Sequence, residues 1–302
     1  MRNFAIETVG LTYKFGNQTV VKDLSLQIPK GSIYGFLGPN GAGKTTTIKI
    51  LLNLLKSPND QVFIFGQEIN ANRIASLKRM GALVEQPAIY AHLTGNENLI
   101  NRCMLLGINK SKAAEMLSLV GLTEAANKKA GNYSLGMKQR LGIALALIAD
   151  PELLLLDEPT NGLDPNGIIE IRNLMIELTA KHGKTILVSS HLLAEIERTA
   201  THVGIINHGQ LLFQGTINEL HNLSKPSVKI ETDNSAVASN ILATAGAEIV
   251  QQDENAVAIT FKGKEDMGNL NTLLVQNGIT VYSISKERKD LENLFLDITS
   301  KN

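Results

Sequence analysis

The chain has 302 residues, and its 29 basic and 29 acidic side chains give a formal net charge of zero. This balance argues against the broad positive field with which proteins attract nucleic acids. A single cysteine, Cys103, excludes an internal disulfide and fits a reducing compartment. The length accommodates one full nucleotide-binding core and a small additional domain.

Membrane-crossing segments are not expected from the sequence. The longest apolar run, Leu141–Ala149, stops at Asp150 and is well short of the ~20 residues that span a bilayer. The first seven residues are too polar and too short a stretch for a signal peptide. If the chain drives transport, the pore therefore belongs to another polypeptide.

The first informative element in chain order is the glycine-rich segment Gly38–Thr45. It follows an expected buried strand over Ser32–Leu37 and precedes an expected helix over Thr46–Leu55, the context that a phosphate-binding loop requires. Its glycines allow backbone N–H groups to approach phosphate, and the helix dipole favours the anion. Lys44 is predicted to reach the β- and γ-phosphates, and the Thr45 hydroxyl to bind Mg²⁺. The predicted ATP contacts of this region are Gly38, Pro39, Asn40, Gly41, Ala42, Gly43, Lys44, Thr45 and Thr46.

Two later segments complete the pattern. Tyr133–Arg140 precedes the apolar run Leu141–Ala149, so Ser134 is placed to cap a helix whose N-terminus can face a phosphate. Leu153–Leu156 is continuously apolar, as a central parallel strand buried on both faces should be. Asp157 directly follows this strand and is predicted to hold the Mg²⁺ shell.

The loop, the Tyr133–Arg140 segment and the Leu153–Glu158 segment together resemble the ATP-binding subunit of ABC transporters, over about residues 4–220. The resemblance implies an α/β P-loop NTPase fold of the ABC ATPase type. Its sheet would be mainly parallel, with a helical subdomain inserted at about residues 86–150. It also implies ATP and Mg²⁺ as ligands, and ATP hydrolysis coupled to transport.

Further site residues follow from this resemblance. Glu158 would be the base that polarises water, and His191 would contact the γ-phosphate and orient that water. Ser134 and Gly136 would grip the γ-phosphate of the opposite subunit's ATP, although Ser-Leu-Gly-Met departs from the usual Ser-Gly-Gly-Gln. Asp164 would lie in the D-loop that crosses the interface. The implied assembly is a head-to-tail homodimer or heterodimer with two ATP molecules between its subunits.

Two assignments have alternatives. The aromatic residue that stacks on adenine is Tyr13 or Phe15, and the family's spacing, an aromatic residue before a glycine about 23 residues ahead of the loop, selects Phe15. In the family, the Q-loop residue senses the γ-phosphate and Mg²⁺ and relays that state to a membrane partner. The register of this segment selects Glu85, where most members carry glutamine, and Gln86 is the alternative shifted by one residue. Glutamate here, with Ser-Leu-Gly-Met in the signature, resembles the lantibiotic- and bacitracin-resistance subgroup.

A polar break at 221–226 marks a domain boundary, which predicts an ATPase domain over 1–222 and an accessory domain over 227–302. The expected β-α-β-β-α-β order of the second domain predicts a small ferredoxin-like α+β unit. This domain has no cluster of catalytic residues. Regulation, support of a dimer and passive packing all remain open as its role.

The sequence therefore predicts an ATP-binding and hydrolysing subunit that powers a separate membrane permease, with export of peptide antibiotics, drugs or lipid-like compounds. The subunit would lie in the cytoplasm, on the inner face of the membrane, held there by the permease.

The segment Glu85–Thr94 is expected to receive a permease helix on Ile89, Tyr90 and Leu93, or else to pack these side chains under the helical subdomain. The alternative function is a soluble ABC ATPase that acts on ribosomes or DNA, although such relatives typically carry two cassettes or a long coiled-coil insertion.

Overall fold

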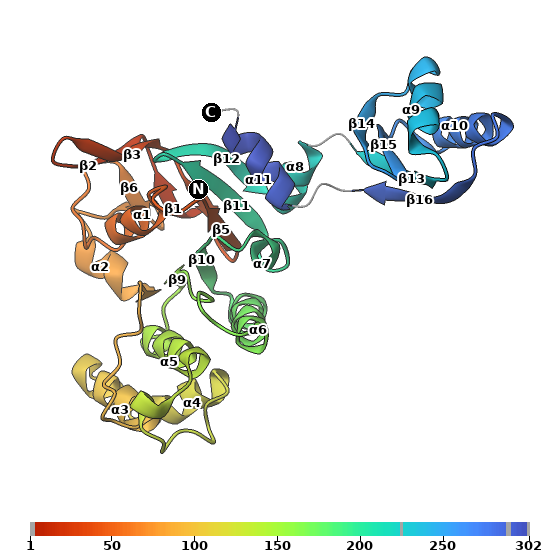
Figure 1. Ribbon diagram of the computed structural model, residues 1–302. Helices are drawn as coiled ribbons and strands as arrows, with labels where there is room; N and C mark the ends of the chain where they lie inside the picture. Colours follow the sequence, from red (N-terminus) through yellow and green to blue (C-terminus); the bar gives the residue numbers. More distant parts are fainter. Residues whose placement is uncertain (1–3, 224–225, 288–290, 301–302) are drawn as a thin grey trace. The chain divides into compact units, whose positions relative to one another are not determined.

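The computed structural model describes residues 4–223, 226–287 and 291–300. The chain divides into two compact units, Met1–Ile217 and Asn218–Asn302 (Figure 1). Residues 224–225 of the expected boundary segment lie outside the described residues, as do residues 1–3 of the expected ATPase domain and residues 288–290 and 301–302 of the expected accessory domain. Among the described residues, no helix combines the length and the apolar character that crossing a membrane requires.

The first unit alternates strands and helices. Its strands are β1 (Phe4–Thr8), β2 (Leu11–Phe15), β3 (Gln18–Leu24), β4 (Gln27–Pro29), β5 (Ile33–Leu37), β6 (Val62–Ile64), β7 (Gln67–Glu68), β8 (Met80–Leu83), β9 (Leu153–Asp157), β10 (Thr185–Ser190), β11 (His202–Asn207) and β12 (Gln210–Thr216). Its helices are α1 (Lys44–Leu51), α2 (Arg73–Lys78), α3 (Gly95–Leu106), α4 (Lys112–Leu119), a 3-10 turn (Ala130–Asn132), α5 (Leu135–Leu147), α6 (Pro165–His182) and α7 (Leu193–Glu197). Helix α8 (Ile217–Asn222) begins at the last residue of this unit.

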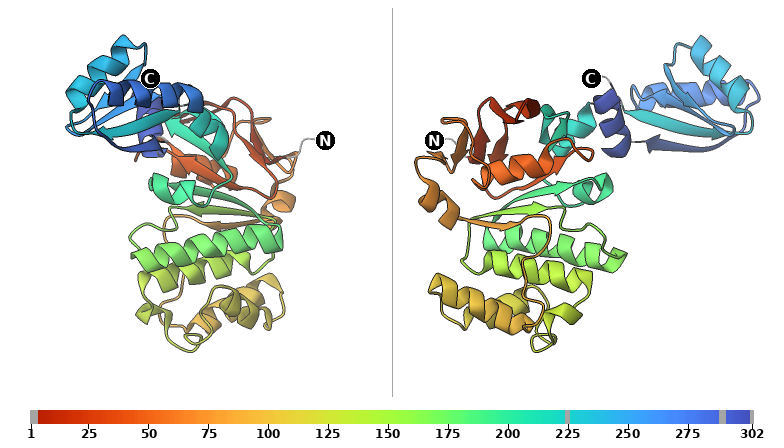
Figure 2. Two further views of the ribbon diagram at one scale, coloured as in Figure 1. Left: turned by 90° about the vertical axis from the view of Figure 1, so that its right-hand side faces the viewer. Right: turned by 60° about the vertical axis from the view of Figure 1, so that its left-hand side comes forward.

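A six-stranded sheet forms the centre of the first unit, in the order β12-β11-β5-β10-β9-β8. Only the edge pair β11 and β12 is antiparallel, which confirms the prediction of a mainly parallel sheet. Leu153–Leu156 of β9 are fully buried, because helices cover both faces: α1 and α6 lie on opposite sides (Figure 2). Beside this sheet lie a four-stranded antiparallel sheet, β4-β1-β6-β7, and the β2-β3 hairpin.

Helices α3, α4 and α5 are inserted between β8 and β9 and pack on one another, with α5 also contacting β8. Helix α3 begins with a reciprocal capping box between Thr94 and Glu97. These hydrogen bonds lower the pKa of the Glu97 carboxyl. The expected helix after the phosphate-binding loop is shorter than predicted, ending at Leu51 rather than Leu55. Asn53, with a φ of 52°, ends the continuous helical backbone.

The second unit is a separate α+β fold. It contains β13 (Ser227–Thr232), α9 (Ser235–Thr244), β14 (Ile249–Gln252), β15 (Ala256–Thr260), α10 (Lys264–Gln276), β16 (Val281–Glu287) and α11 (Leu291–Ser300). The sheet order is β14-β15-β13-β16 with every pairing antiparallel, which confirms the predicted ferredoxin-like arrangement. Val228 and Ile230 of β13 pack with Leu242 of α9 and Leu274 of α10 in its core.

Candidate ATP-binding and hydrolysis site

The glycine-rich loop joins β5 to α1 and has two positions at which a side chain would not fit. Gly43 caps α1 with a φ of 104°, and a Cβ there would lie 2.9 Å from the carbonyl oxygen of Val20. A Cβ at Gly38 would collide with the carbonyl oxygen of Ile206. The backbone therefore lies close to its surroundings. The loop also leads into the N-terminus of α1, where the first N–H groups of a helix have no partner within the helix and can bind a phosphate.

Lys44 is buried at the start of α1 and has no free access to bulk water. Its Nζ donates to the carbonyl oxygens of Gly38 at 2.6 Å and Pro39 at 3.3 Å. The same ammonium lies 3.4 Å from Oε1 of Glu158. The loop thus holds one desolvated cation whose present partners are carbonyls and one carboxylate, and phosphate oxygens can replace these.

Asp157 connects three elements of the site. Its Oδ2 accepts a hydrogen bond from the Thr45 hydroxyl at 2.8 Å, and its Oδ1 accepts one from the Ser189 hydroxyl at 2.5 Å. The parallel register of β9 and β10 pairs residues 157 and 189, which explains the second contact. A hydroxyl and a carboxylate at one point are hard oxygen donors of the kind that Mg²⁺ prefers, so these residues fit that cation.

Ser189 has no counterpart among the residues expected from the sequence. It is fully buried, and its hydroxyl also accepts a hydrogen bond of 2.9 Å from the backbone N–H of Glu158. The available signal was a polar residue that ends the apolar strand Thr185–Val188, on the strand adjacent to β9. Sequence alone does not show that β9 and β10 are neighbours, so it could not identify Asp157 as the partner of the Ser189 hydroxyl.

Glu158 and His191 lie side by side at the ends of β9 and β10. His191 Nδ1 is 2.7 Å from Glu158 Oε2, and the Glu158 backbone has a positive φ of 47°. The imidazole is more exposed than the carboxylate, with side-chain exposures of 40% and 20%. The pair therefore combines a partly shielded carboxylate with a solvent-accessible imidazole, which can orient a water molecule.

The expected signature and D-loop residues lie at helix N-termini. Ser134 caps α5 by accepting a hydrogen bond from Met137 N at 3.2 Å, and Asp164 caps α6 by accepting one from Gly167 N at 3.1 Å. A Cβ at Gly136 would find nothing closer than 3.8 Å. The neighbouring Leu135, 47% exposed, packs against Gly162 of the D-loop segment.

The structure also describes the two residues considered for adenine stacking and the two considered for the Q-loop. Phe15, 50% exposed at the end of β2, packs edge-on against Tyr13 with ring centroids 5.1 Å apart. Glu85 follows β8 with a φ of 61°, and its Oε1 accepts a hydrogen bond from Lys49 of α1 at 2.6 Å. Gln86 is exposed.

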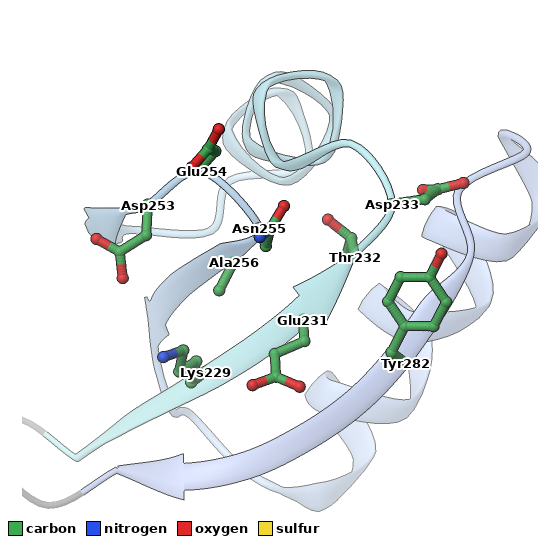
Figure 3. A pocket seen from close by; sticks show the side chains of 9 residues that line it. All are labelled: Lys229, Glu231, Thr232, Asp233, Asp253, Glu254, Asn255, Ala256 and Tyr282. Atoms are coloured by element: carbon green, nitrogen blue, oxygen red, sulfur yellow. The ribbon is translucent and has the colours of Figure 1, made fainter.

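A hollow of about 680 Å³ lies in the C-terminal unit, and none of these residues lines it. Side chains from β13, β16 and the turn before β15 surround it (Figure 3): Lys229, Glu231, Thr232, Asp233, Asp253, Glu254, Asn255, Ala256 and Tyr282. Its Glu231 carboxylate accepts a hydrogen bond from Ser283 at 2.9 Å.

The parallel sheet with its glycine loop, adjacent lysine and acidic strand end defines the chain as a P-loop nucleoside triphosphatase. The family model described as ABC transporter matches residues 21–161. Bacitracin transport ATP-binding protein BcrA of Bacillus licheniformis is 43% identical over 97% of this chain and 96% of its own length. The chain therefore belongs to the ATP-binding proteins of ABC transporters, a family that binds ATP, and its activity is ATP hydrolysis coupled to transport.

Two further proteins are similar over about 70% of this chain. Lantibiotic transport ATP-binding protein SrtF of Streptococcus pyogenes is 39% identical over 71% of this chain and 92% of its own length. A dimeric ATP-binding cassette in a post-hydrolysis state with bound ADP and Pi superposes with a TM-score of 0.62 at 25% identity, covering 70% of this chain and 98% of that one.

Proposed function

We propose that this chain is the ATPase subunit of an exporter of peptide antibiotics or similar amphipathic compounds, and that it powers a separate membrane permease. The observation that carries the proposal is the 43% identity with a bacitracin transport protein, because it extends over both units of the chain. The 39% identity with a lantibiotic transport protein supports the same class of cargo. A permease partner would hold the chain at the inner face of the cytoplasmic membrane.

Each group of the site has a role in this proposal. Lys44 and the loop N–H groups bind the β- and γ-phosphates, and Phe15 stacks on adenine. Thr45 and Asp157 would hold Mg²⁺, which supplies charge neutralisation on the phosphates. Glu158 accepts the proton of the attacking water, and His191 orients both that water and the γ-phosphate.

The proposed active unit is a dimer, of two copies of this chain or of this chain with a related subunit. Ser134 and Gly136 at the N-terminus of α5 offer a helix dipole and N–H groups to a phosphate of the opposite subunit, with Asp164 nearby in the interface. The similarity to a dimeric cassette with ADP and Pi supports this assembly. Zero net charge supports partners other than nucleic acid.

The proposed permease contact is the segment between β8 and α3. Tyr90 is 52% exposed, while Ile89 and Leu93 are half-buried beside it. Buried Asn98 holds this backbone, accepting from Tyr90 N at 2.8 Å and donating to Tyr90 O at 3.1 Å and Thr94 O at 2.9 Å. A rigid segment with one projecting aromatic ring suits a helix-in-groove contact.

The test has two parts. The tagged chain is purified from membranes by affinity, and the bacitracin tolerance of the strain that expresses it is measured. Tyr90→Ala should reduce permease recovery while largely sparing ATP binding. Tyr282→Ala is the matched control, because Tyr282 is 67% exposed in the other unit. Wild-type protein that recovers no membrane protein, or tolerance equal in wild-type and Glu158→Gln strains, would contradict the proposed export function.

A further inference from the structure

An ion pair connects the phosphate-loop helix to the segment that leads to the proposed permease contact. Lys49 Nζ of α1 lies 2.6 Å from Glu85 Oε1, with side-chain exposures of 34% and 63%. Glu85 has a φ of 61°, in the left-handed region that non-glycine residues rarely occupy. Such strained residues persist where the surroundings hold them, and they concentrate at switches and ligand sites.

Lys49 is well placed to act on the proposed metal position. It lies four residues after Thr45 in α1, so the two side chains leave the same face of the helix. Thr45 in turn donates to Asp157. Lys49, which contacts Glu85, therefore leaves α1 one helical turn beyond Thr45, whose hydroxyl would bind Mg²⁺.

Charge explains why Glu85 benefits from such a partner. In its proposed Q-loop role, Glu85 would join Asp157 and Glu158 as the third carboxylate at one nucleotide site, and like charges that approach each other are unfavourable. Lys44 lies 3.4 Å from Glu158, and Lys49 lies 2.6 Å from Glu85. Each lysine thus neutralises one carboxylate of the nucleotide-free protein. A glutamine in place of Glu85 would carry no charge and would not need the second lysine.

We propose that Lys49 is a positioning residue: it holds Glu85 in the nucleotide-free protein and releases it to the Mg²⁺·ATP site when nucleotide binds. This inference rests on the proposed role of Glu85 as the Q-loop residue. Because the pair is largely exposed, it contributes little stability. A weak pair suits an exchange, since the carboxylate can leave Lys49 for a doubly charged cation without a large penalty.

The first experiment measures binding, with hydrolysis removed by Glu158→Gln. A fluorescent ATP analogue is titrated with Mg²⁺ in the full chain. Lys49→Met should lower the Mg²⁺ concentration at half-saturation about two- to fivefold, the size of an exposed ion pair, because Glu85 loses its competing partner. Lys49→Arg should restore the original value. Lys181→Met is the control, because it removes another exposed pair, Lys181 with Glu177, whose atoms are 3.0 Å apart.

The decisive comparison repeats the Lys49→Met titration in a Glu85→Gln background. The shift should vanish there, because no carboxylate remains for Lys49 to hold. An equal shift in both backgrounds would show a general effect of charge and overturn the inference, as would no shift in either. Failure of the Q-loop assignment gives a different result: in the otherwise unchanged chain, Glu85→Ala would leave Mg²⁺ dependence and hydrolysis unchanged, while Gln86→Ala alters them.

A second experiment detects the contact itself. Carbodiimide joins an amine to a carboxylate in direct contact, so the nucleotide-free Glu158→Gln protein should yield a cross-linked peptide containing Lys49 and Glu85. Saturating Mg²⁺·ATP should reduce its yield several-fold, while the Lys181–Glu177 cross-link stays constant. An undiminished Lys49–Glu85 yield would refute the exchange.

Discussion

Glu158 is held between two basic groups: His191 Nδ1 lies 2.7 Å from its Oε2, and Lys44 Nζ lies 3.4 Å from its Oε1. The proposed base is therefore engaged at both oxygen atoms before nucleotide enters. A triphosphate bound to the loop would take Lys44 from Glu158 and leave the carboxylate with the imidazole. We therefore expect ATP binding itself to release Glu158 from Lys44 and prepare it to act as the base.

Glu158→Gln should abolish turnover while retaining nucleotide. The amide keeps the size of the side chain but cannot accept a proton, so phosphate release should fall about 10²–10⁴-fold. Because the binding groups remain, gel filtration with Mg²⁺·ATP should show a stable dimer. A variant that elutes as a monomer at high protein concentration and saturating ATP would contradict the proposed assembly.

Lys44→Ala should weaken ATP binding itself. It removes a buried charged donor worth about 1.5–3 kcal/mol, which corresponds to roughly 10- to 150-fold in affinity. Equilibrium binding of labelled ATP measures the change. Lys181→Ala, at a side chain 72% exposed on α6, should leave affinity unchanged. Equal affinities for wild type and Lys44→Ala would rule out the assigned phosphate contact.

Phe15→Ala should weaken ATP binding, since stacking of a base on an aromatic ring contributes about 1–3 kcal/mol. The chain contains no tryptophan, so Phe15→Trp introduces a single reporter whose fluorescence should change when ATP binds. Phe65→Trp, at a ring that stacks with Arg79 at 3.7 Å, is the silent control. A response from Tyr13→Trp alone would select Tyr13 as the adenine platform instead.

Ser189→Ala should impair both stability and turnover. It leaves Asp157 Oδ1 without its hydroxyl donor, at a cost of about 1–3 kcal/mol. The Glu158 N–H loses the same hydroxyl but keeps its hydrogen bond of 3.2 Å to the Ser189 carbonyl oxygen. Melting temperature should fall by about 2–4 °C for each kcal/mol, and kcat should fall more than ATP affinity. Ser190→Ala, which removes only a bond from Leu192 N, is the matched control. Equal effects of Ser189→Ala and Ser190→Ala would contradict the proposal that the Ser189 hydroxyl positions Asp157 and Glu158.

Cys103 should be unreactive in the folded chain. Its side chain is fully buried in α3, and burial raises the pKa of the thiol, so little thiolate forms at neutral pH. A chromogenic disulfide reagent should therefore react slowly with native protein and rapidly in denaturant. Fast reaction of the native protein would contradict the buried position of Cys103.

The order of secondary-structure elements and the phosphate-binding loop could be predicted from local sequence. One continuous segment, residues 38–45, carries the glycines, the lysine and the hydroxyl of the loop, so their mutual distances depend on the backbone of that segment alone. The apolar run at 153–156 likewise identified a central strand, because burial on both faces leaves no position for a polar residue. Helix α1 shows the limit: periodicity extended it to Leu55, whereas the backbone at Asn53 ends it earlier.

Contacts between distant residues were decided by the tertiary structure. Ser189 and Asp157 are 32 residues apart and meet only because β9 and β10 pair in parallel register. Lys49 and Glu85, 36 residues apart, meet because the segment that follows β8 passes α1. Such contacts depend on strand order, and strand order is set by how whole helices and sheets bury their apolar faces, not by the residues at the site.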